Sequence, residues 1–132
     1  MLVKRLFDVT TSLLGLLILA PLLIIIAFLV KTGSRGPVLF RQKRVGQFGV
    51  CFQVLKFRTM VVDAEKLGPK ISAVKDKRIT RIGSILRQLK LDELPQLVNV
   101  LVGQMSLVGP RPEVPKYVAL FREDYERSEE RR

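Results

Sequence analysis

The stretch from Val9 to Val30, VTTSLLGLLILAPLLIIIAFLV, holds 22 residues without a single charge. About 20 apolar residues are enough for a helix to cross the hydrocarbon core of a bilayer, so this stretch predicts a membrane-embedded helix. A cleaved signal peptide fits less well, because the apolar region is long and no small-x-small cleavage site precedes Lys31. A single-pass signal anchor and a re-entrant helix are both compatible with the hydropathy.

Two features of this stretch favour the re-entrant form. Pro21, which follows Ala20, removes a backbone hydrogen bond near the middle of the helix and predicts a break there. Both flanks are basic, with Lys4 and Arg5 before the stretch and several lysines and arginines from Lys31 onward. The positive-inside rule keeps both flanks in the cytoplasm, which a straight span cannot satisfy. We therefore expect a helix that is broken at Ala20-Pro21 and that enters and leaves by the same leaflet.

This interpretation divides the chain into residues 1–32, the re-entrant membrane segment, and residues 33–132, a cytoplasmic domain at the membrane interface. Arg5 and Asp8 lie three positions apart on one face of the predicted helix. Opposite charges at this spacing can pair at the interface, or they form an ordinary surface pair that contributes little.

The composition narrows the possible chemistry. The chain has 132 residues, a formal net charge of +11, one cysteine and no histidine. These counts exclude His-based catalysis, His-ligated zinc and an internal disulfide, so acid–base or metal chemistry falls to carboxylates, lysines and arginines. The basic character predicts an anionic partner, which is a nucleic acid, a lipid head-group surface or a phosphorylated substrate.

A β-hairpin is predicted for residues 38–44 and 50–57, which are rich in β-branched and aromatic residues and flank the Gly46–Gly49 turn. The Gly-x-x-Gly spacing also occurs in phosphate loops, but alone it is more typical of a turn. Lys56 and Arg58 are two positions apart, so both cations are expected on one face of the second strand. That face is either a solvated surface or a cationic wall for phosphate.

Two helices are predicted after the hairpin. Residues 81–91 carry apolar residues at the spacing of an amphipathic helix, with Arg87 off the apolar stripe. Such a helix packs on a core or lies on the membrane with its cations toward the head groups. A second periodic run follows Asp92, and Pro95 is tolerated only in the first turn of a helix. The segment between hairpin and helices, residues 61–79, predicts a loop with one short helix.

Asp92 and Glu93 stand at the predicted N-terminus of the second helix. Asp is a favoured N-cap and Glu suits the positive end of the helix dipole, so the pair needs no further role. The alternative is phosphate chemistry, because a helix N-terminus binds anions and Arg111, between two prolines, offers a fork for phosphate. Mg²⁺ prefers a carboxylate plus substrate phosphates, so one carboxylate could bind the metal while the other attacks phosphorus. Three more cations are within possible reach of the same phosphate: Lys56, Arg58 and Arg87.

Several blocks of sequence carry a resemblance to a known family. They are KRLFD (4–8), the mid-membrane proline, QKRVG (42–46), KFRTM (56–60), DKRIT (76–80), LDELPQL (91–97), NVL (99–101) and MSLVGPRP (105–112). With these blocks the chain resembles the bacterial sugar transferases, the monotopic phosphoglycosyl transferase family, over nearly all of residues 3–118. The last two blocks together are highly specific.

The resemblance implies an enzyme of the cytoplasmic face of the bacterial inner membrane. Members of the family move a sugar phosphate from a nucleoside-diphosphate sugar, here expected to be a UDP-sugar, to polyprenyl phosphate and release the nucleoside monophosphate. This is the first membrane step of glycoconjugate or exopolysaccharide synthesis. By this resemblance Asp92 is the nucleophile that forms a phosphoglycosyl-aspartate intermediate, and Glu93 binds Mg²⁺. The resemblance assigns the phosphate contacts to three cations: Lys56, Arg87 and Arg111.

The chain departs from the family pattern in two places. Many members have Ser-Pro at the membrane break, where this chain has Ala20-Pro21 and lacks a hydroxyl that could satisfy freed backbone groups. The family normally continues past its last helix into a segment with an Arg-Pro-Gly-type motif. Here the tail YVALFREDYERSEERR (117–132) predicts a final amphipathic helix and then ends in charge, which predicts a C-terminally truncated form.

Two other functional classes remain as alternatives. One is a non-catalytic module that binds anionic membrane lipids through its basic surface, in which Asp92 is only a cap. The other is a membrane-tethered nucleic-acid binder, but the chain has no recognizable reading motif, so we expect no nucleic-acid partner. The expected fold is α+β and mainly helical, with a re-entrant membrane helix, a small β-hairpin and amphipathic interfacial helices.

Overall fold

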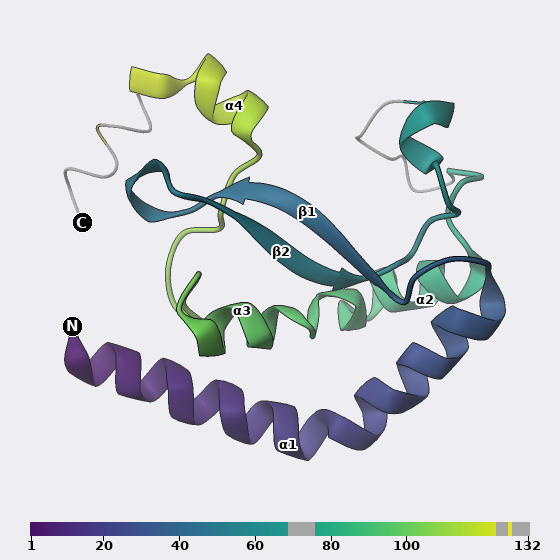
Figure 1. The fold of residues 1–132 in the computed structure, drawn as a ribbon, viewed down its shortest axis with the longest axis horizontal. Coiled ribbons are helices and arrows are strands. Elements are labelled where there is room, and N and C mark those ends of the chain that lie inside the picture. The colour runs from purple at the N-terminus through teal and green to yellow at the C-terminus, as the bar shows by residue number, and fades with distance from the viewer. Residues whose placement is uncertain (69–75, 124–126, 128–132) are drawn as a thin grey trace.

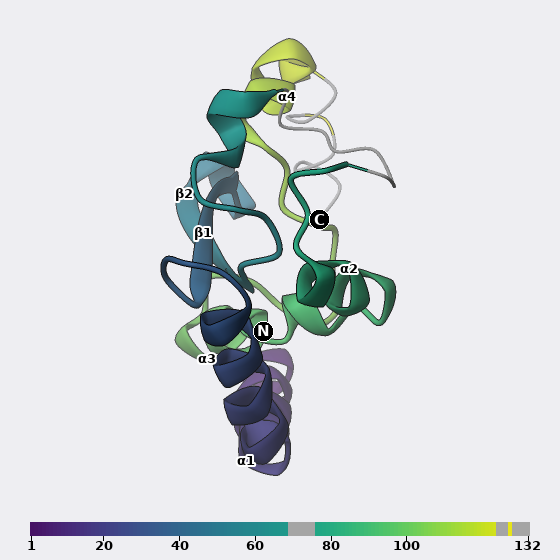
Figure 2. The same cartoon turned by 90° about the vertical axis from the view of Figure 1, so that its right-hand side faces the viewer.

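The described part of the chain is mainly helical and contains one two-stranded antiparallel sheet, as the sequence predicts. The structure, a computed structural model, describes residues 1–68, 76–123 and 127. In chain order its elements, with η for a 3₁₀ turn, are α1 (Leu2–Gly33), β1 (Leu39–Val45), η1 (Gln47–Gly49), β2 (Cys51–Phe57), η2 (Ala64–Leu67), α2 (Arg81–Gln88), η3 (Leu91–Glu93), α3 (Gln96–Val102) and α4 (Pro115–Leu120). Figures 1 and 2 show α1 along one side, α2 and α3 over it, and the hairpin beyond α3.

Most predicted elements are found near their expected positions. The hairpin is confirmed, with β1 and β2 paired from Leu39↔Phe57 to Val45↔Cys51. The short helix expected within residues 61–79 is η2, while residues 69–75 of that loop lie outside the described residues. The helix predicted in the tail is found at its start as α4, and residues 124–126 and 128–132 of the tail lie outside the described residues.

The long helix α1 continues through Pro21. The predicted separation into two helices at Ala20-Pro21 is therefore not confirmed. Figure 1 instead shows the helix axis bending near its middle, so that α1 curves around one side of the molecule. A proline removes an amide donor and crowds the preceding turn, which accounts for a bend at this point.

The surface of α1 is apolar and open. The helix has a mean hydropathy of 3.2 over its most apolar window, and only 11% of that window is buried against the rest of the protein. By length and composition α1 is long enough to cross a bilayer. A core helix of a soluble protein would be mostly buried, so the exposed apolar face of α1 suggests membrane association.

One narrow face of α1 packs on the domain along the whole length of the helix. In its first half, Asp8 and Ser12 are buried, and a Cβ at Gly15 would lie 3.3 Å from Leu97 Cδ1 of α3. In its second half, Ile26 and Val30 enter the core. The small residues of the first half thus allow α3 to approach α1 closely.

The hydrophobic core lies where the second half of α1 meets the end of β2 and α2. Its buried members are Ile26, Val30, Phe57 and Leu86. Only part of the apolar stripe predicted for residues 81–91 is buried in the core, since Leu86 is buried whereas Ile85 and Leu89 are exposed. Leu91 and Leu94 also pack against the core, and they fix the segment between them.

Arg5 and Asp8 do not pair with each other, which corrects the predicted interfacial ion pair. Arg5 Nη1 donates to the carbonyl of Val100 at 2.8 Å, and its Nη2 donates to the carbonyl of Leu101 at 2.7 Å. Asp8 Oδ1 accepts from the amide of Leu107 at 3.2 Å. The carbonyls at the C-terminus of α3 have no partners within the helix, so the guanidinium of Arg5 binds them in preference to the carboxylate of Asp8, which lies on α1 like Arg5. The two side chains therefore tie α3 and the following loop to the start of α1.

Asn99 joins α3 to the free edge of β2. It is 2% exposed, its Oδ1 accepts from the amide of Leu55 at 3.0 Å, and its Nδ2 donates to the carbonyl of Gln53 at 2.8 Å. The side chain thus takes the place of a neighbouring strand. The Gln104 side chain completes this buried network by accepting a second hydrogen bond from Nδ2 at 2.6 Å.

Replacing Asn99 by Leu should destabilise the fold by about 2–4 kcal/mol, because it leaves an amide and a carbonyl of β2 buried without partners. The measurement is thermal unfolding in detergent micelles. The control is Val98→Ala on the exposed side of the same helix, which should shift the unfolding temperature much less. Equal shifts for the two variants would show that the strand edge does not depend on Asn99.

Candidate active site

The carboxylates Asp92 and Glu93 lie in a tight reversal between α2 and α3. Lys90 adopts a left-handed conformation with φ of 58°, which ends α2 and turns the chain into η3. Leu91 and Leu94 then anchor the turn in the core. The two carboxylates between these anchors are each partly exposed, so the turn presents them on a fixed backbone.

Asp92 does not cap a helix. The next helix, α3, begins at Gln96, and its N-cap is Pro95, which offers no side-chain hydrogen bond. The predicted cap is wrong because the chain forms the separate 3₁₀ turn η3 before Pro95 rather than one continuous helix from Asp92. The carboxylate of Asp92 is therefore not committed to backbone amides of α3.

Glu93 is held by two cations from distant parts of the chain. Lys56 Nζ on β2 lies 3.1 Å from Glu93 Oε1, and Arg111 Nη2 pairs with the same oxygen. Burial would raise the pKa of Glu93, but the hydrogen bond from Lys56 and the charges of Lys56 and Arg111 outweigh it and hold the pKa below its ordinary value. Glu93 is thus an ionised carboxylate at neutral pH.

Asp92 has the opposite electrostatic character. No salt bridge within residues 1–68, 76–123 and 127 involves its carboxylate. Burial raises its pKa, the adjacent charge of Glu93 raises it further, and the charges of Lys56 and Arg87 only partly compensate. A partly buried carboxylate with a raised pKa and no salt bridge in the described structure is a candidate nucleophile.

The loop that carries Arg111 is attached to the hairpin. The amide of Val45 donates to the carbonyl of Glu113 at 2.8 Å, forming an isolated antiparallel bridge, and Arg44 Nη1 donates to the carbonyl of Pro112 at 3.2 Å. Residues far apart in the chain thereby bring Arg111 to Glu93. The two prolines that flank Arg111 restrict its backbone, and these hydrogen bonds to the hairpin fix the position of the loop.

Arg87 approaches the site from α2. Its Nε donates to Thr59 Oγ1 at 2.8 Å, and its charge acts on Asp92. Thr59 is itself buried, and its carbonyl accepts from the amide of Thr80 at 2.9 Å. The segment after β2 therefore determines where the guanidinium of Arg87 lies.

Arg58 lies apart from the carboxylates. It is 6% exposed, and its Nη2 donates to the carbonyl of Ser34 at 2.9 Å and to Ser34 Oγ at 2.8 Å, at the end of α1. β2 ends at Phe57, so the strand alternation that predicted Arg58 beside Lys56 does not extend to this residue. Of the four predicted phosphate-binding cations, the structure brings three toward the carboxylates, namely Lys56, Arg87 and Arg111.

The donor set is compatible with a magnesium ion that also binds substrate phosphate. Among the described residues no cluster of three or more acidic or cysteine ligands exists, so the protein does not form a complete metal cage. Lys56 and Arg111 both donate to Oε1 of Glu93, which leaves Oε2 for a metal ion. Mg²⁺ commonly takes one or two carboxylates and completes its shell with phosphate oxygens and water.

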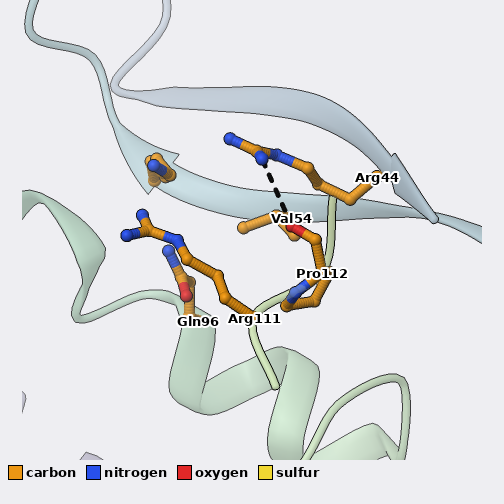
Figure 3. Close-up of a pocket in the computed structure, with 6 residues that line it drawn as sticks. Arg44, Val54, Gln96, Arg111 and Pro112 are labelled. Carbon is orange, nitrogen blue, oxygen red and sulfur yellow. Dashed lines mark hydrogen bonds between the residues drawn. The ribbon is translucent and has the colours of Figure 1, made fainter. Parts of the chain in front are cut away.

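Two residues of this region were missed by sequence reasoning. Arg44 and Gln96 line a small open pocket together with Arg111, Pro112, Val54 and Lys56, and Figure 3 shows the side chains of Arg111 and Gln96 next to each other. Arg44 lies in the block QKRVG (42–46), and Gln96 lies in the block LDELPQL (91–97), which also contains the two carboxylates. Those blocks were the available signal, but they do not say which side chains face the site.

Comparisons with known proteins identify the family of the chain. The chain matches the family model described as bacterial sugar transferase over residues 1–132. It is 54% identical over 117 residues to an undecaprenyl-phosphate glucose phosphotransferase of Komagataeibacter xylinus, a match that covers 88% of this chain and 22% of that protein. It is 49% identical over 123 residues to a UDP-glucose:undecaprenyl-phosphate glucose-1-phosphate transferase of Klebsiella pneumoniae, covering 92% of this chain and 26% of that protein.

A third relative is named for a different sugar. The chain is 42% identical over 119 residues to a UDP-N-acetylgalactosamine-undecaprenyl-phosphate N-acetylgalactosaminephosphotransferase of Aeromonas hydrophila, covering 90% of this chain and 28% of that protein. The chain thus spans only about a quarter of the length of these three relatives. Because their names include both glucose and N-acetylgalactosamine, similarity at this level does not identify a sugar.

Proposed function

We propose that this chain, which belongs to the bacterial sugar transferase family, carries the catalytic core of a membrane-bound phosphoglycosyl transferase. It moves a sugar 1-phosphate from a nucleoside-diphosphate sugar to a polyprenyl phosphate, as the first membrane step of a glycoconjugate. Relatives named for UDP-sugars and undecaprenyl phosphate support a UDP-sugar donor, an undecaprenyl acceptor and UMP as the released product.

The observation that carries this proposal is the unequal environment of the two adjacent carboxylates. Glu93 is paired with Lys56 and Arg111, while Asp92 has a raised pKa and no salt bridge in the described structure. A purely structural pair would not need one member to be poorly solvated and unpaired. The cations around it match the charge of a diphosphate.

In the first displacement, a carboxylate oxygen of Asp92 attacks the phosphorus that carries the sugar. The bond from phosphorus to Asp92 forms while the bond from phosphorus to the nucleoside monophosphate breaks, and the electron pair leaves with that product. Lys56, Arg87 and Arg111 stabilise the negative charge on the phosphate oxygens. Glu93 would hold Mg²⁺, which when bound supplies further positive charge to the diphosphate.

In the second displacement, an oxygen of polyprenyl phosphate attacks the same phosphorus. The bond from phosphorus to Asp92 breaks, and the carboxylate is regenerated with its electron pair. The two displacements form a ping-pong cycle, and neither requires a histidine or an external base, because both nucleophiles are already ionised. This agrees with a chain that contains no histidine.

The contacts of α1 support a monotopic attachment. Near one end, Arg5 binds carbonyls of α3, and at the other end Ser34 binds Arg58 after β2. Asn99 connects α3 to β2, so both ends of α1 are held by one polar domain. A single polar domain at both ends of the helix supports a position on one side of the bilayer. The basic flanks favour the cytoplasmic side, where anionic lipids would attract the net charge of +11. The bend at Pro21 is compatible with re-entry into the same leaflet.

The experiment that tests the function is a half-reaction without acceptor. Wild-type protein in detergent or nanodiscs is mixed with Mg²⁺ and UDP-sugars labelled in the sugar phosphate, and bound label and UMP are measured. We expect stoichiometric labelling, UMP release, and discharge of the label by polyprenyl phosphate. EDTA should suppress labelling. Release of UMP without labelled protein would contradict a covalent intermediate, and no reaction with any nucleotide sugar would favour a non-catalytic membrane module.

A further inference from the structure

The pocket beside the carboxylates lies between the hairpin and the start of α3 (Figure 3). Glu93 pairs with both Lys56 and Arg111 in its wall and offsets one of their two positive charges, whereas Arg44 forms no salt bridge within the described residues. With three cations and only the carboxylate of Glu93 paired to them, this group has a surplus of two positive charges, a composition that suits an anionic ligand.

Neutral partners hold Arg44 in place. Its Nη1 donates to the carbonyl of Pro112 at 3.2 Å and its Nη2 donates to Gln42 Oε1 at 2.9 Å. In Figure 3 the guanidinium groups of Arg44 and Arg111 extend toward the same side of the loop that carries Pro112. Burial, followed by the like charge of Arg111, lowers the pKa of Arg44, against smaller opposing effects of Glu113 and Glu93. Two guanidinium groups held this close would be stabilised by a shared anion.

The position of the pocket indicates which substrate supplies that anion. The pocket lies where β2 meets α3, whereas α1 packs on α3 from the other side (Figures 1 and 2). A lipid phosphate arrives from the side of α1, which carries the exposed apolar surface. A soluble nucleotide arrives from the opposite side. The pocket thus lies on the side of α3 that faces away from α1 (Figure 1).

We propose that Arg44 and Arg111 form a second anion site that binds the phosphate leaving with the nucleoside of the donor. The proposal rests on the proposed function, and it names Arg44 as a further substrate-binding residue. A diphosphate presents two adjacent anionic groups. One lies over Asp92 for attack, and the other lies in the pocket, where Gln96 adds a neutral hydrogen-bond donor.

The test compares three variants of the full chain in detergent micelles. Arg44→Gln removes the charge but keeps a donor for the Pro112 carbonyl, Arg44→Lys keeps the charge without the fork, and Lys43→Gln removes a neighbouring exposed cation as a control. Equilibrium binding of UDP is measured first, because it needs no catalysis. The rates of protein labelling by nucleotide sugar and of discharge to polyprenyl phosphate follow.

We expect Arg44→Gln to weaken UDP binding and slow labelling by about 10- to 100-fold, as for loss of a charged hydrogen-bonding partner. Arg44→Lys should recover part of the loss, and Lys43→Gln should stay within about twofold of wild type. Discharge to polyprenyl phosphate should be unchanged.

Three outcomes would overturn the proposal. Equal binding of UDP by Arg44→Gln and Lys43→Gln would show that Arg44 holds no donor phosphate. A defect confined to discharge would assign the pocket to the lipid phosphate instead. If Arg44→Lys binds UDP no better than Arg44→Gln, the positive charge at position 44 does not contribute to UDP binding. If UDP binding depends on Arg44 but wild type is never labelled, the anion site stands and the proposed covalent function fails.

Discussion

Asp92→Asn should abolish the proposed transfer while making the folded protein more stable at neutral pH. Asn is close to Asp in shape, but its amide does not attack phosphorus, so labelling of the protein should fall by about 10³-fold or more. Stability should move the other way, because burial and the charge of Glu93 raise the pKa of Asp92. The folded protein therefore holds this ionised carboxylate at a free-energy cost that Asn removes.

The pH dependence of stability makes this prediction specific. Since the folded-state pKa of Asp92 lies above its ordinary value of 3.8, its stabilising contribution is full below that pH and is lost as pH rises through the raised pKa. The unfolding temperature of Asp92→Asn should exceed that of wild type by a few degrees at neutral pH, for a difference of about 1 kcal/mol. In acid the two proteins should unfold together.

Glu93→Gln is the matched control, and its effect on the unfolding temperature should be opposite to that of Asp92→Asn. The pKa of Glu93 is lowered, so its contribution is present above its ordinary value of 4.5 and is lost as pH falls through the lowered pKa. This variant should unfold at a lower temperature than wild type at neutral pH and approach wild type in acid. Shifts of both variants in the same direction, or wild-type labelling of Asp92→Asn, would contradict the assigned roles.

Gly83→Ala should destabilise the protein strongly, although glycine to alanine in a helix usually stabilises by about 0.5–1 kcal/mol. A Cβ at Gly83 would lie 2.1 Å from the carbonyl oxygen of Thr59 and 2.6 Å from its Cα. Both are backbone atoms, and that carbonyl also accepts from the amide of Thr80, so no side-chain rotation relieves the clash. Separating α2 from the Thr59 segment should cost on the order of 3 kcal/mol.

The same variant should slow protein labelling, because the clash displaces the segment that binds Arg87 through Thr59 Oγ1. Thermal unfolding and labelling rate at a temperature where the variant is folded are the two measurements. Ser84→Ala, at the exposed neighbouring position, controls for helix propensity and should be neutral or slightly stabilising. A Gly83→Ala protein as stable as Ser84→Ala would mean that α2 and the Thr59 segment are not in close contact.

Local sequence patterns predicted most of the secondary structure, although not the continuous course of α1 through Pro21. The uncharged run of residues 9–30 predicted the long apolar helix, and the strand pattern around Gly46–Gly49 predicted the hairpin. These predictions succeed because hydrophobic periodicity and turn residues act over a few positions of the chain. The prediction that Asp92 caps a helix also came from a few neighbouring residues, but it was wrong. Pro95 and the left-handed conformation of Lys90 favour a separate 3₁₀ turn over one longer helix.

Candidate residues could be named from the sequence, but their partners could not. Arg58 and Lys56 are close in the chain, yet Arg58 binds the end of α1 while Lys56 binds Glu93. Arg5 and Asp8 have ideal helical spacing, yet each binds a group about 95 or more residues away. In both cases burial of open carbonyls and amides decided the partner.

The amino-acid order alone was enough to predict a long apolar helix, a basic domain without histidine, and an adjacent carboxylate pair as candidate nucleophile and metal ligand. Only the packed molecule showed that Asp92 and Glu93 have opposite pKa shifts, and only it brought Arg44 into the same pocket as Arg111. The reason is that pKa values and anion sites depend on distances between charges. Those distances are established when α3, β2 and the loop after α3 come together.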